Sequence, residues 1–415
     1  QGCPRSVPRG APPWARQGMA PSMASGGGAP VRYKGSNFLR QRLILATVSG
    51  RPVTITDIRV HDEEPGLRDF EASFVRLLDK ICDGSDIHID ETGTTLRYRP
   101  GQIIGGDGLV HTCPSSRGLV YFLEGLLLLA PLAKQPISVR LKGVTNGGPD
   151  PSCDTFRTAT LPMLARFGIS EQLTFKILRR GAPPGGGGEV LFSCPILKAI
   201  QPVDLLDEGK VKRVRGVAYT ARVSPQFAAR MVDAARGVLN DFLPDVWIYS
   251  DHCKGNLCGE SPGFGVSLVA ETITKCLKSA DATAILGEAD GAQAAAGDRG
   301  EGAAGEEGEE ESISLATPEG VGRAAAKRLL AEIDLDGAVD TVHQALVLYF
   351  LSLGEETKPG RVRLSKLSPA AVQMLRHIRD FLGVVFQIKE DHGDGGSVVL
   401  SCLGAGITNM ARKTF

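Results

Sequence analysis

The chain has 415 residues, of which 42% are hydrophobic and 23% charged, and its 47 basic residues balance 47 acidic ones. A chain of this size and composition can bury one large core or several smaller ones. Its longest apolar run, LVYFLEGLLLLAPLA (119–133), is too short for a bilayer and contains Glu124. We therefore interpret the run as a core helix and expect no membrane contact.

Nine cysteines occur singly, without the spacing of a disulfide framework, which indicates a reducing compartment such as the cytosol or nucleus. His252, Cys253 and Cys258 in DHCKGNLC (251–258) are of metal-binding types. Their spacing matches no standard zinc motif, and no fourth ligand is adjacent. We therefore predict neither a metal site nor a cofactor.

Residues 1–30 combine Pro, Gly, Ala and Arg without a continuous apolar stretch, so they do not form a signal peptide. We expect this segment to be disordered. Its composition is typical of a translated upstream region, which would place the true start codon at Met19 or Met23.

A helix followed by two alternating strands recurs three times in the rest of the sequence. In each copy, apolar residues recur at helical spacing and then switch to a period of two. The helices are expected at 66–85, 151–170 and 367–383, and the strand pairs at 87–100, 173–195 and 384–403. A further strand (VTITDIRV, ISVRLKGV or VRLSKL) introduces each copy. We predict an α/β (α+β) fold in which three repeated helix-plus-sheet units share one extended core.

The third unit is interrupted by another α/β pattern. Strands at 215–224, 245–251 and 263–273 and a helix at 225–243 predict a small inserted domain over residues 208–286. The main body is expected at 31–207 and again at 314–415. We predict that the helix 317–333 restarts this body, with Thr317 as its N-cap and Pro318 in its first turn.

Residues 287–313 form a Gly-, Ala- and Glu-rich loop that we expect to be disordered. Segment 288–311 contains nine acidic residues and one arginine, so the remaining chain has a formal net charge of about +8. That charge suits contact with RNA or an acidic partner. A solvated spacer is the expected role of the loop, and an acidic docking segment is the alternative.

Six segments spread over roughly residues 31–410 follow one another in the order SNFLRQRLILATVSGRPVTITDIRV, PGLRDFEASFVRLLDKI, TGTTLRYRPGQIIGG, LKGVTN, RRGAPPGGGGEV and PGFGVSLVAET. In this set and order they resemble the RNA 3′-terminal phosphate cyclase superfamily, and most of all its eukaryotic cyclase-like branch in ribosome biogenesis. The resemblance implies an RNA 3′-phosphate cyclase-like fold of three related α/β units plus an inserted domain. That organisation agrees with the periodicity.

The resemblance also implies where catalysis would occur. Enzymes of this superfamily attach an adenylate to a histidine that follows a Ser-Cys pair at the start of the helix before the last hairpin. Here Ser368 and Pro369 match the pair and Ala370 matches the histidine. An alanine methyl group cannot accept an adenylate. His377 lies two helical turns further on, and we expect it to be a surface or half-buried residue.

Three more positions depart from the pattern that the resemblance implies. Tyr33 replaces a glutamate seven residues before the retained Arg40. Asp62 replaces an arginine, although Arg59 is kept, and this reversed charge would repel a triphosphate. A His-Gln pair replaces Asp-Gln, so only Gln344 is retained. These coordinated losses predict a protein with no catalytic residue.

The loop RRGAPPGGGGEV (179–190) still has the chemistry to bind an anion, because guanidinium groups and unhindered amides suit phosphate oxygens. The candidate residues for phosphate or RNA-backbone contact are Arg40, Arg59, Arg179, Arg180, Gly185, Gly186, Gly187 and Gln344. The alternative is a tight glycine-rich hairpin braced by salt-bridged arginines.

We therefore expect a non-enzymatic ribosome biogenesis factor. The resemblance implies a nuclear and nucleolar location, the small-subunit processing complex, pre-rRNA cleavage and 18S rRNA maturation. It also implies pre-rRNA, a nucleolar assembly GTPase and other processing factors as partners. An RNA endonuclease is one alternative, with Asp62, Glu63, Glu64 and Asp69 as candidate carboxylates, although a solvated helix start explains them equally well. An active cyclase is a further, less favoured alternative.

Overall fold

The computed structural model describes residues 29–169, 173–284, 315–391 and 396–409. The acidic loop expected at 287–313, nearly all of the segment expected to be disordered at 1–30, and both candidate start methionines lie outside these ranges. No helix within the described ranges is long and apolar enough to cross a membrane.

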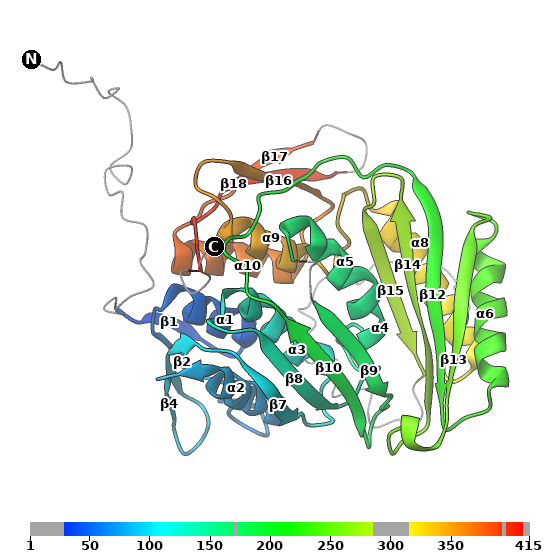
Figure 1. Ribbon diagram of the computed structural model, residues 1–415, viewed down its shortest axis with the longest axis horizontal. Helices are drawn as coiled ribbons and strands as arrows, with labels where there is room; N and C mark the ends of the chain where they lie inside the picture. The colour runs from blue at the N-terminus through cyan, green and yellow to red at the C-terminus, as the bar shows by residue number, and fades with distance from the viewer. Residues whose placement is uncertain (1–28, 170–172, 285–314, 392–395, 410–415) are drawn as a thin grey trace, which may run out of the picture.

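Three units with one topology make up the main body (Figure 1). The first contains β1 (Val31–Lys34), α1 (Leu39–Ser49), β2 (Val53–Thr56), α2 (Asp69–Ile81), β4 (Asp86–Ile89) and β5 (Leu96–Arg99). The second contains β7 (Gly106–Thr112), α3 (Leu119–Leu129), β8 (Ile137–Gly143), α4 (Cys153–Thr155), α5 (Leu161–Leu164), β9 (Thr174–Arg179) and β10 (Gly188–Cys194). The third contains β11 (Asp204–Leu205), α9 (Gln344–Leu353), β16 (Pro359–Leu364), α10 (Pro369–Leu382), β17 (Gln387–Glu390) and β18 (Val398–Leu403).

The sheets repeat one strand order, β1-β2-β5-β4, β7-β8-β10-β9 and β11-β16-β18-β17. In each, the first two strands are parallel and the last two form an antiparallel hairpin. A two-stranded ladder, β3 (Cys82–Asp83) with β6 (Gln102–Ile103), lies beside the first sheet's hairpin. The predicted fold class of three repeated helix-plus-sheet units is therefore confirmed.

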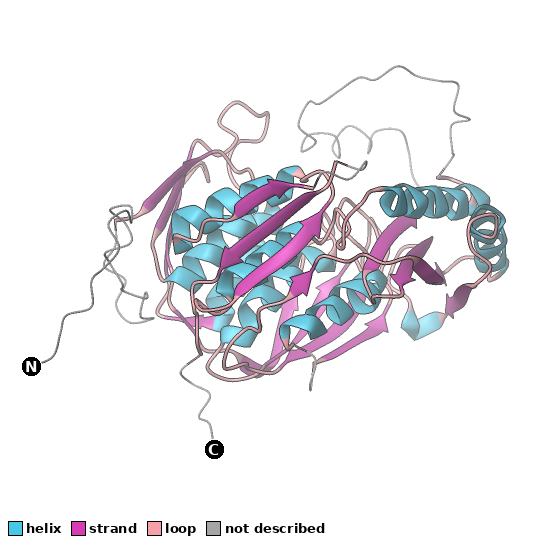
Figure 2. Ribbon diagram, turned by 90° about the horizontal axis from the view of Figure 1, so that it is seen from above, coloured by secondary structure: helices cyan, strands magenta, loops and turns pink. Residues whose placement is uncertain are grey.

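One continuous core joins the three units. Helices α1, α3, α9 and α10 pack on one another inside the body, with sheets on the outside (Figure 2). Helix α2 illustrates why such helices form: Phe74, Leu77, Leu78 and Ile81 repeat at helical spacing and are buried. At its N-terminus the Glu71 carboxylate accepts a hydrogen bond of 2.9 Å from the Arg68 backbone amide, which satisfies a free N–H group.

The helix expected at 151–170 is irregular. It is divided into α4, a π-helical turn (Phe156–Thr160), α5 and a 3₁₀ turn (Ala165–Phe167). Pro162 explains part of the break, because proline has no N–H group to continue the helical ladder. The widened π turn precedes this proline.

A second lobe follows β11. It contains the sheet β13-β12-β14-β15, covered on one face by α6 and α8 (Figure 1). Its elements are β12 (Val211–Ala221), α6 (Gln226–Leu239), β13 (Val246–Cys253), β14 (Gly263–Thr272), β15 (Leu277–Thr283) and α8 (Pro318–Asp334). We call this the inserted lobe.

The prediction that the helix 317–333 restarts the main body is wrong. Helix α8 packs on α6 and the inserted sheet, and Val321, Ala325 and Leu329 belong to the core of the inserted lobe. Its N-terminus is as expected, since the Thr317 hydroxyl accepts a hydrogen bond of 3.2 Å from the Gly320 amide. The chain therefore returns to the main body only after α8.

Buried polar contacts join the lobes. Asp281 of β15 accepts hydrogen bonds from the Ser152 amide at 2.7 Å and the Thr155 hydroxyl at 2.6 Å. Burial raises the pKa of Asp281 despite these bonds. On the same strand, the Ser279 hydroxyl donates to Asp340 at 2.6 Å. Buried groups with such partners fix one orientation of the lobes.

Candidate functional site

The position implied for the family nucleophile lies at the start of α10. Ser368 caps this helix by accepting a hydrogen bond of 3.2 Å from the Ala371 amide, and Pro369 follows in the first turn. The carbonyl of Ala370 accepts a hydrogen bond of 3.2 Å from the Gln41 side chain on α1. The side chain at this position is a methyl group, which has no lone pair with which to attack a phosphate.

His377 is buried between α10 and α1, with only 1% of its surface exposed, so the expectation of a surface or half-buried residue is wrong. Its Nδ1 lies 3.2 Å from Gln41 Oε1, and its Nε2 accepts a hydrogen bond from Arg42 at 3.4 Å. Burial and the Arg42 charge lower the pKa of His377 to about 4. Both ring nitrogens are engaged, so this imidazole does not replace the missing nucleophile.

Tyr33 lies on β1, at the position where the resemblance implies a glutamate. Its hydroxyl donates a hydrogen bond of 3.0 Å to Asp380, and the Arg42 guanidinium lies 4.5 Å from its ring centre. Its ring also meets His377 edge-on at 5.2 Å. Burial, followed by the Asp380 charge, raises the pKa of Tyr33. These contacts form a packed joint between β1, α1 and α10.

Arg40 and Arg59, two of the candidate anion-binding residues, are paired with carboxylates. Arg40 donates to Glu124 and, at 2.7 Å, to the carbonyl of Tyr121. Arg59 donates to both oxygens of Glu71 at 2.6 and 2.9 Å, from a left-handed backbone with φ of 46°. Each guanidinium therefore meets a neutralising charge before any ligand arrives.

The carboxylates named for the endonuclease alternative lie along the loop before α2 and, at Asp69, on the first residue of that helix. Asp62 and Glu64 pair with the Arg68 guanidinium at 3.5 and 3.0 Å. Asp69 accepts from the Ser116 hydroxyl at 2.7 Å. Among the described residues, no three His, Cys, Asp or Glu side chains are grouped to hold a metal ion. The cluster has the features of a solvated helix start.

Arg180 is buried within the glycine loop, with 3% of its surface exposed. It donates to both oxygens of Asp154 at 2.6 and 3.0 Å and to Asp251 of the inserted lobe at 2.8 Å. Its guanidinium also lies 5.0 Å from the centre of the Tyr219 ring. These partners overcome burial and raise its pKa. The geometry favours the bracing alternative for this side chain.

Arg179 is half-buried and donates to the Cys258 carbonyl at 2.6 Å. The glycine amides are also engaged: Gly185 donates to the Ser261 hydroxyl at 2.9 Å, and Gly186 to the Ala182 carbonyl at 2.9 Å. Gly187, with φ of 71°, lies so close to residues 259–260 that an added Cβ would be 3.2 Å from their backbone. The loop thus locks the second unit to the inserted lobe.

Gln344 is buried at the start of α9. Its side chain makes hydrogen bonds to the segment that links β16 to α10. It donates to the Ser365 hydroxyl and the Lys366 carbonyl, both at 3.2 Å, and accepts from the Ser368 amide at 2.8 Å. These bonds fix the N-terminus of α10. All the hydrogen bonds that the Gln344 side chain makes among the described residues therefore serve to position α10.

Next to it, His343 and Asp340 form a buried pair whose imidazole Nδ1 and carboxylate lie 2.5 Å apart. The other ring nitrogen is 2.7 Å from the Thr160 hydroxyl. Burial opposes the charged imidazole, but attraction to Asp340 outweighs it and raises the pKa of His343. Asp340, His343 and Thr160 are each at most 1% exposed, so the triad is closed to substrates.

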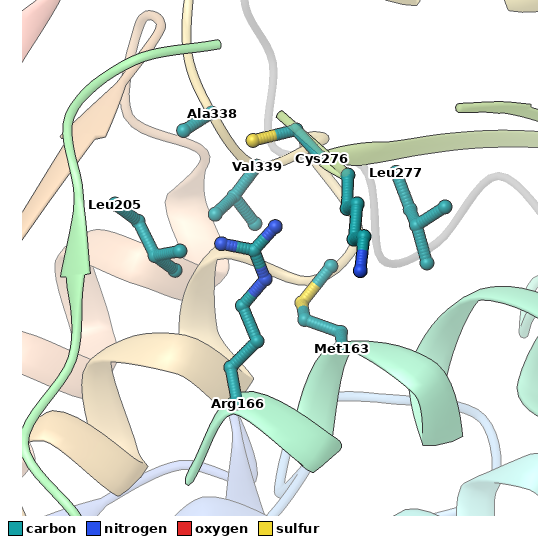
Figure 3. A pocket seen from close by; sticks show the side chains of 8 residues that line it. Met163, Arg166, Leu205, Cys276, Leu277, Ala338 and Val339 are labelled. Carbon is teal, nitrogen blue, oxygen red and sulfur yellow. The ribbon is translucent and has the colours of Figure 1, made fainter. Parts of the chain in front are cut away.

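Sequence reasoning found the arginines but not their partners. Gln41 and Arg42 bind His377, which lies more than three hundred residues away, and Asp154 binds Arg180 across a separation of 26 residues, so no local spacing pairs them. None of these residues is in the lining of the small pocket that lies between the lobes (Figure 3). Its lining includes Met163, Arg166, Leu205, Cys276 and Val339.

Comparisons with known proteins agree on one family. The family model for RNA 3′-terminal phosphate cyclase matches residues 31–388. The mouse RNA 3′-terminal phosphate cyclase-like protein is 49% identical over 388 residues, covering 92% of this chain and 97% of its own. A probable cyclase-like protein of Dictyostelium discoideum is 46% identical, covering 93% and 100%. The rRNA processing protein rcl1 of Schizosaccharomyces pombe is 41% identical, covering 92% and 98%.

Proposed function

Because this chain belongs to the RNA 3′-terminal phosphate cyclase family, we propose that it keeps the family fold without the family reaction and acts in ribosome biogenesis. In this proposal it is a non-enzymatic factor of the nucleolar small-subunit processing complex. It supports pre-rRNA cleavage and 18S rRNA maturation by binding RNA and protein partners.

The proposal rests on the α1–α10 joint, the packed contact that Gln41 and Arg42 of α1 and Tyr33 of β1 make with α10. The resemblance places the adenylate at Ala370, which offers only a methyl group. His377 has both nitrogens engaged. At the position where the resemblance implies a glutamate, Tyr33 donates a hydrogen bond to Asp380. The residues that would surround a nucleotide phosphate instead hold two elements of the protein together.

The name of one relative supports the biological setting. The S. pombe relative is called an rRNA processing protein, and it is similar over nearly the whole of both chains. By the same likeness we propose pre-rRNA, a nucleolar assembly GTPase and other small-subunit processing factors as partners, in the nucleolus.

The test is replacement of the S. pombe relative by this chain in fission yeast depleted of its own protein. We expect 18S rRNA to accumulate normally and pre-rRNA to be recovered with the protein after cross-linking. An Ala370→Gly variant, which also lacks a nucleophile, should replace it equally well. Failure of the wild-type chain to cross-link pre-rRNA while it is stably expressed would contradict the proposal.

A further inference from the structure

An aromatic pair is exposed on the sheet of the inserted lobe. Trp247 and Tyr249 on β13 keep 57% and 60% of their surface exposed, and their ring centres lie 6.0 Å apart. The intervening Ile248 points to the opposite face and packs in the core with α6. Strand alternation therefore directs both rings outward.

The rings lie beside basic side chains. In the parallel register of β12 with β13, Arg215 is opposite Trp247 and Val217 is opposite Tyr249. Arg215 and Arg213 face outward with them, and the segment KVKRVR (210–215) has four basic residues among six. Toward β14 and β15, this same face is covered by the main body, so the open part is the β12–β13 edge.

Acidic partners neutralise only part of this charge. Arg215 pairs with Asp245 at 2.8 Å, and Arg213 with Glu271 at 2.6 Å. The hydrogen bond from Arg215 lowers the pKa of Asp245, and the positive charges of Arg215, Arg213 and Lys212 lower it further. Both ion pairs are partly exposed, and exposed pairs contribute little stability. Either guanidinium can therefore exchange its carboxylate for a phosphate at small cost.

We propose that this β12–β13 face binds single-stranded RNA. Trp247 and Tyr249 stack on two bases, and Arg213 and Arg215 hold the flanking phosphates. Stacking on exposed sheet aromatics next to guanidinium groups is a general way in which proteins bind unpaired nucleotides. The inference rests on the proposed RNA-binding function and assigns it a surface, away from the α1–α10 joint and the glycine loop.

The test compares Trp247→Ala/Tyr249→Ala with the ring-retaining control Trp247→Phe/Tyr249→Phe in the full chain. The probes are a fluorescein-labelled, unstructured ten-nucleotide RNA and a duplex RNA, measured by fluorescence anisotropy. We expect the alanine variant to bind the single strand about 10- to 100-fold more weakly, and the phenylalanine variant to stay within about threefold of wild type. Duplex affinity should change by less than about twofold, because paired bases cannot stack on the rings.

The failures are distinguishable. If wild type and the alanine variant bind the single strand equally, the surface is wrong and the proposed function stands. If wild type binds neither this RNA nor pre-rRNA, the inference falls together with the proposed function. If the substitutions instead abolish self-association and leave RNA affinity unchanged, the face binds a second copy of the chain, which also overturns the inference. Similar melting temperatures for the two variants would exclude misfolding as the cause of weaker binding.

Discussion

At residue scale, the two adjacent arginines of the glycine loop differ in burial, since Arg180 is buried and Arg179 is only half-buried. Arg180 lies between Asp154 and Asp251, whereas the Arg179 side chain makes one described hydrogen bond, to the Cys258 carbonyl. Arg180→Ala would leave the Asp154 carboxylate buried without its main partner, so we expect a loss of about 3–5 kcal/mol in the free energy of unfolding. Arg179→Ala should cost about 0.5–1.5 kcal/mol. Urea unfolding of both variants measures the difference.

The same two variants address phosphate binding. If Arg179 binds the RNA backbone, its replacement should weaken RNA binding and reduce the dependence of log Kd on log salt by about 0.7–0.9 for each phosphate that is no longer neutralised. The bracing alternative predicts a lower stability with RNA affinity unchanged, which is the outcome that the geometry favours for Arg180. Equal and small stability losses for both variants would contradict the burial-based account.

The buried His343–Asp340 pair predicts a pH dependence. Since the folded-state pKa of His343 is raised, its contribution is fully present below the ordinary histidine pKa of about 6.5 and is lost as pH rises through the folded value. The folded-state pKa of Asp340 is lowered, so its contribution is lost as pH falls through that lower value. We expect the stability difference between wild type and His343→Gln to be largest near about pH 5–6 and to shrink at alkaline pH. A constant difference would contradict a charged pair.

At element scale, the close contact of α6 and α8 is testable with two glycines. A Cβ added at Gly322 on α8 would lie 2.4 Å from the Met231 carbonyl oxygen, whereas one at Gly237 on α6 would meet nothing within 4 Å. Gly237→Ala should therefore stabilise the protein by up to about 1 kcal/mol, as expected for an exposed helix position. Gly322→Ala should destabilise it by about 1–3 kcal/mol despite the same gain in helix propensity. Stabilisation by both substitutions would contradict the packing of α8 on α6.

Most of the predicted helices and strands follow from the local spacing of apolar residues. Helices α2, α6 and α10 and the hairpins after α2, α5 and α10 have strong patterns, and the structure has them near the expected positions. The assignment of α8 failed because its amphipathic pattern shows that one face is buried but not which core buries it. The burial of His377 was missed for the same reason, since the partner face is supplied by α1, more than three hundred residues away in the chain.

At the scale of the whole molecule, three repeated units and an inserted lobe are held together by buried charges and hydrogen bonds. The family resemblance found in the sequence is confirmed. It implies the positions at which we expect this chain to depart from the family pattern. At those positions the structure has a tight α1–α10 joint, formed by Gln41, Arg42, His377 and Tyr33. Anion binding by the candidate residues stays a prediction. The four arginines and Gln344 all bind other groups of the protein.

We propose that this cyclase fold does not perform the cyclase reaction. The most direct measurement is incubation of the purified chain with radiolabelled ATP, a divalent cation and an RNA bearing a 3′-phosphate, next to an active cyclase as positive control. We predict no AMP bound covalently to the chain and an unchanged 3′-phosphate, since Ala370 has no atom that can attack phosphorus. Acid-labile AMP on the protein, or a 2′,3′-cyclic phosphate on the RNA, would contradict it.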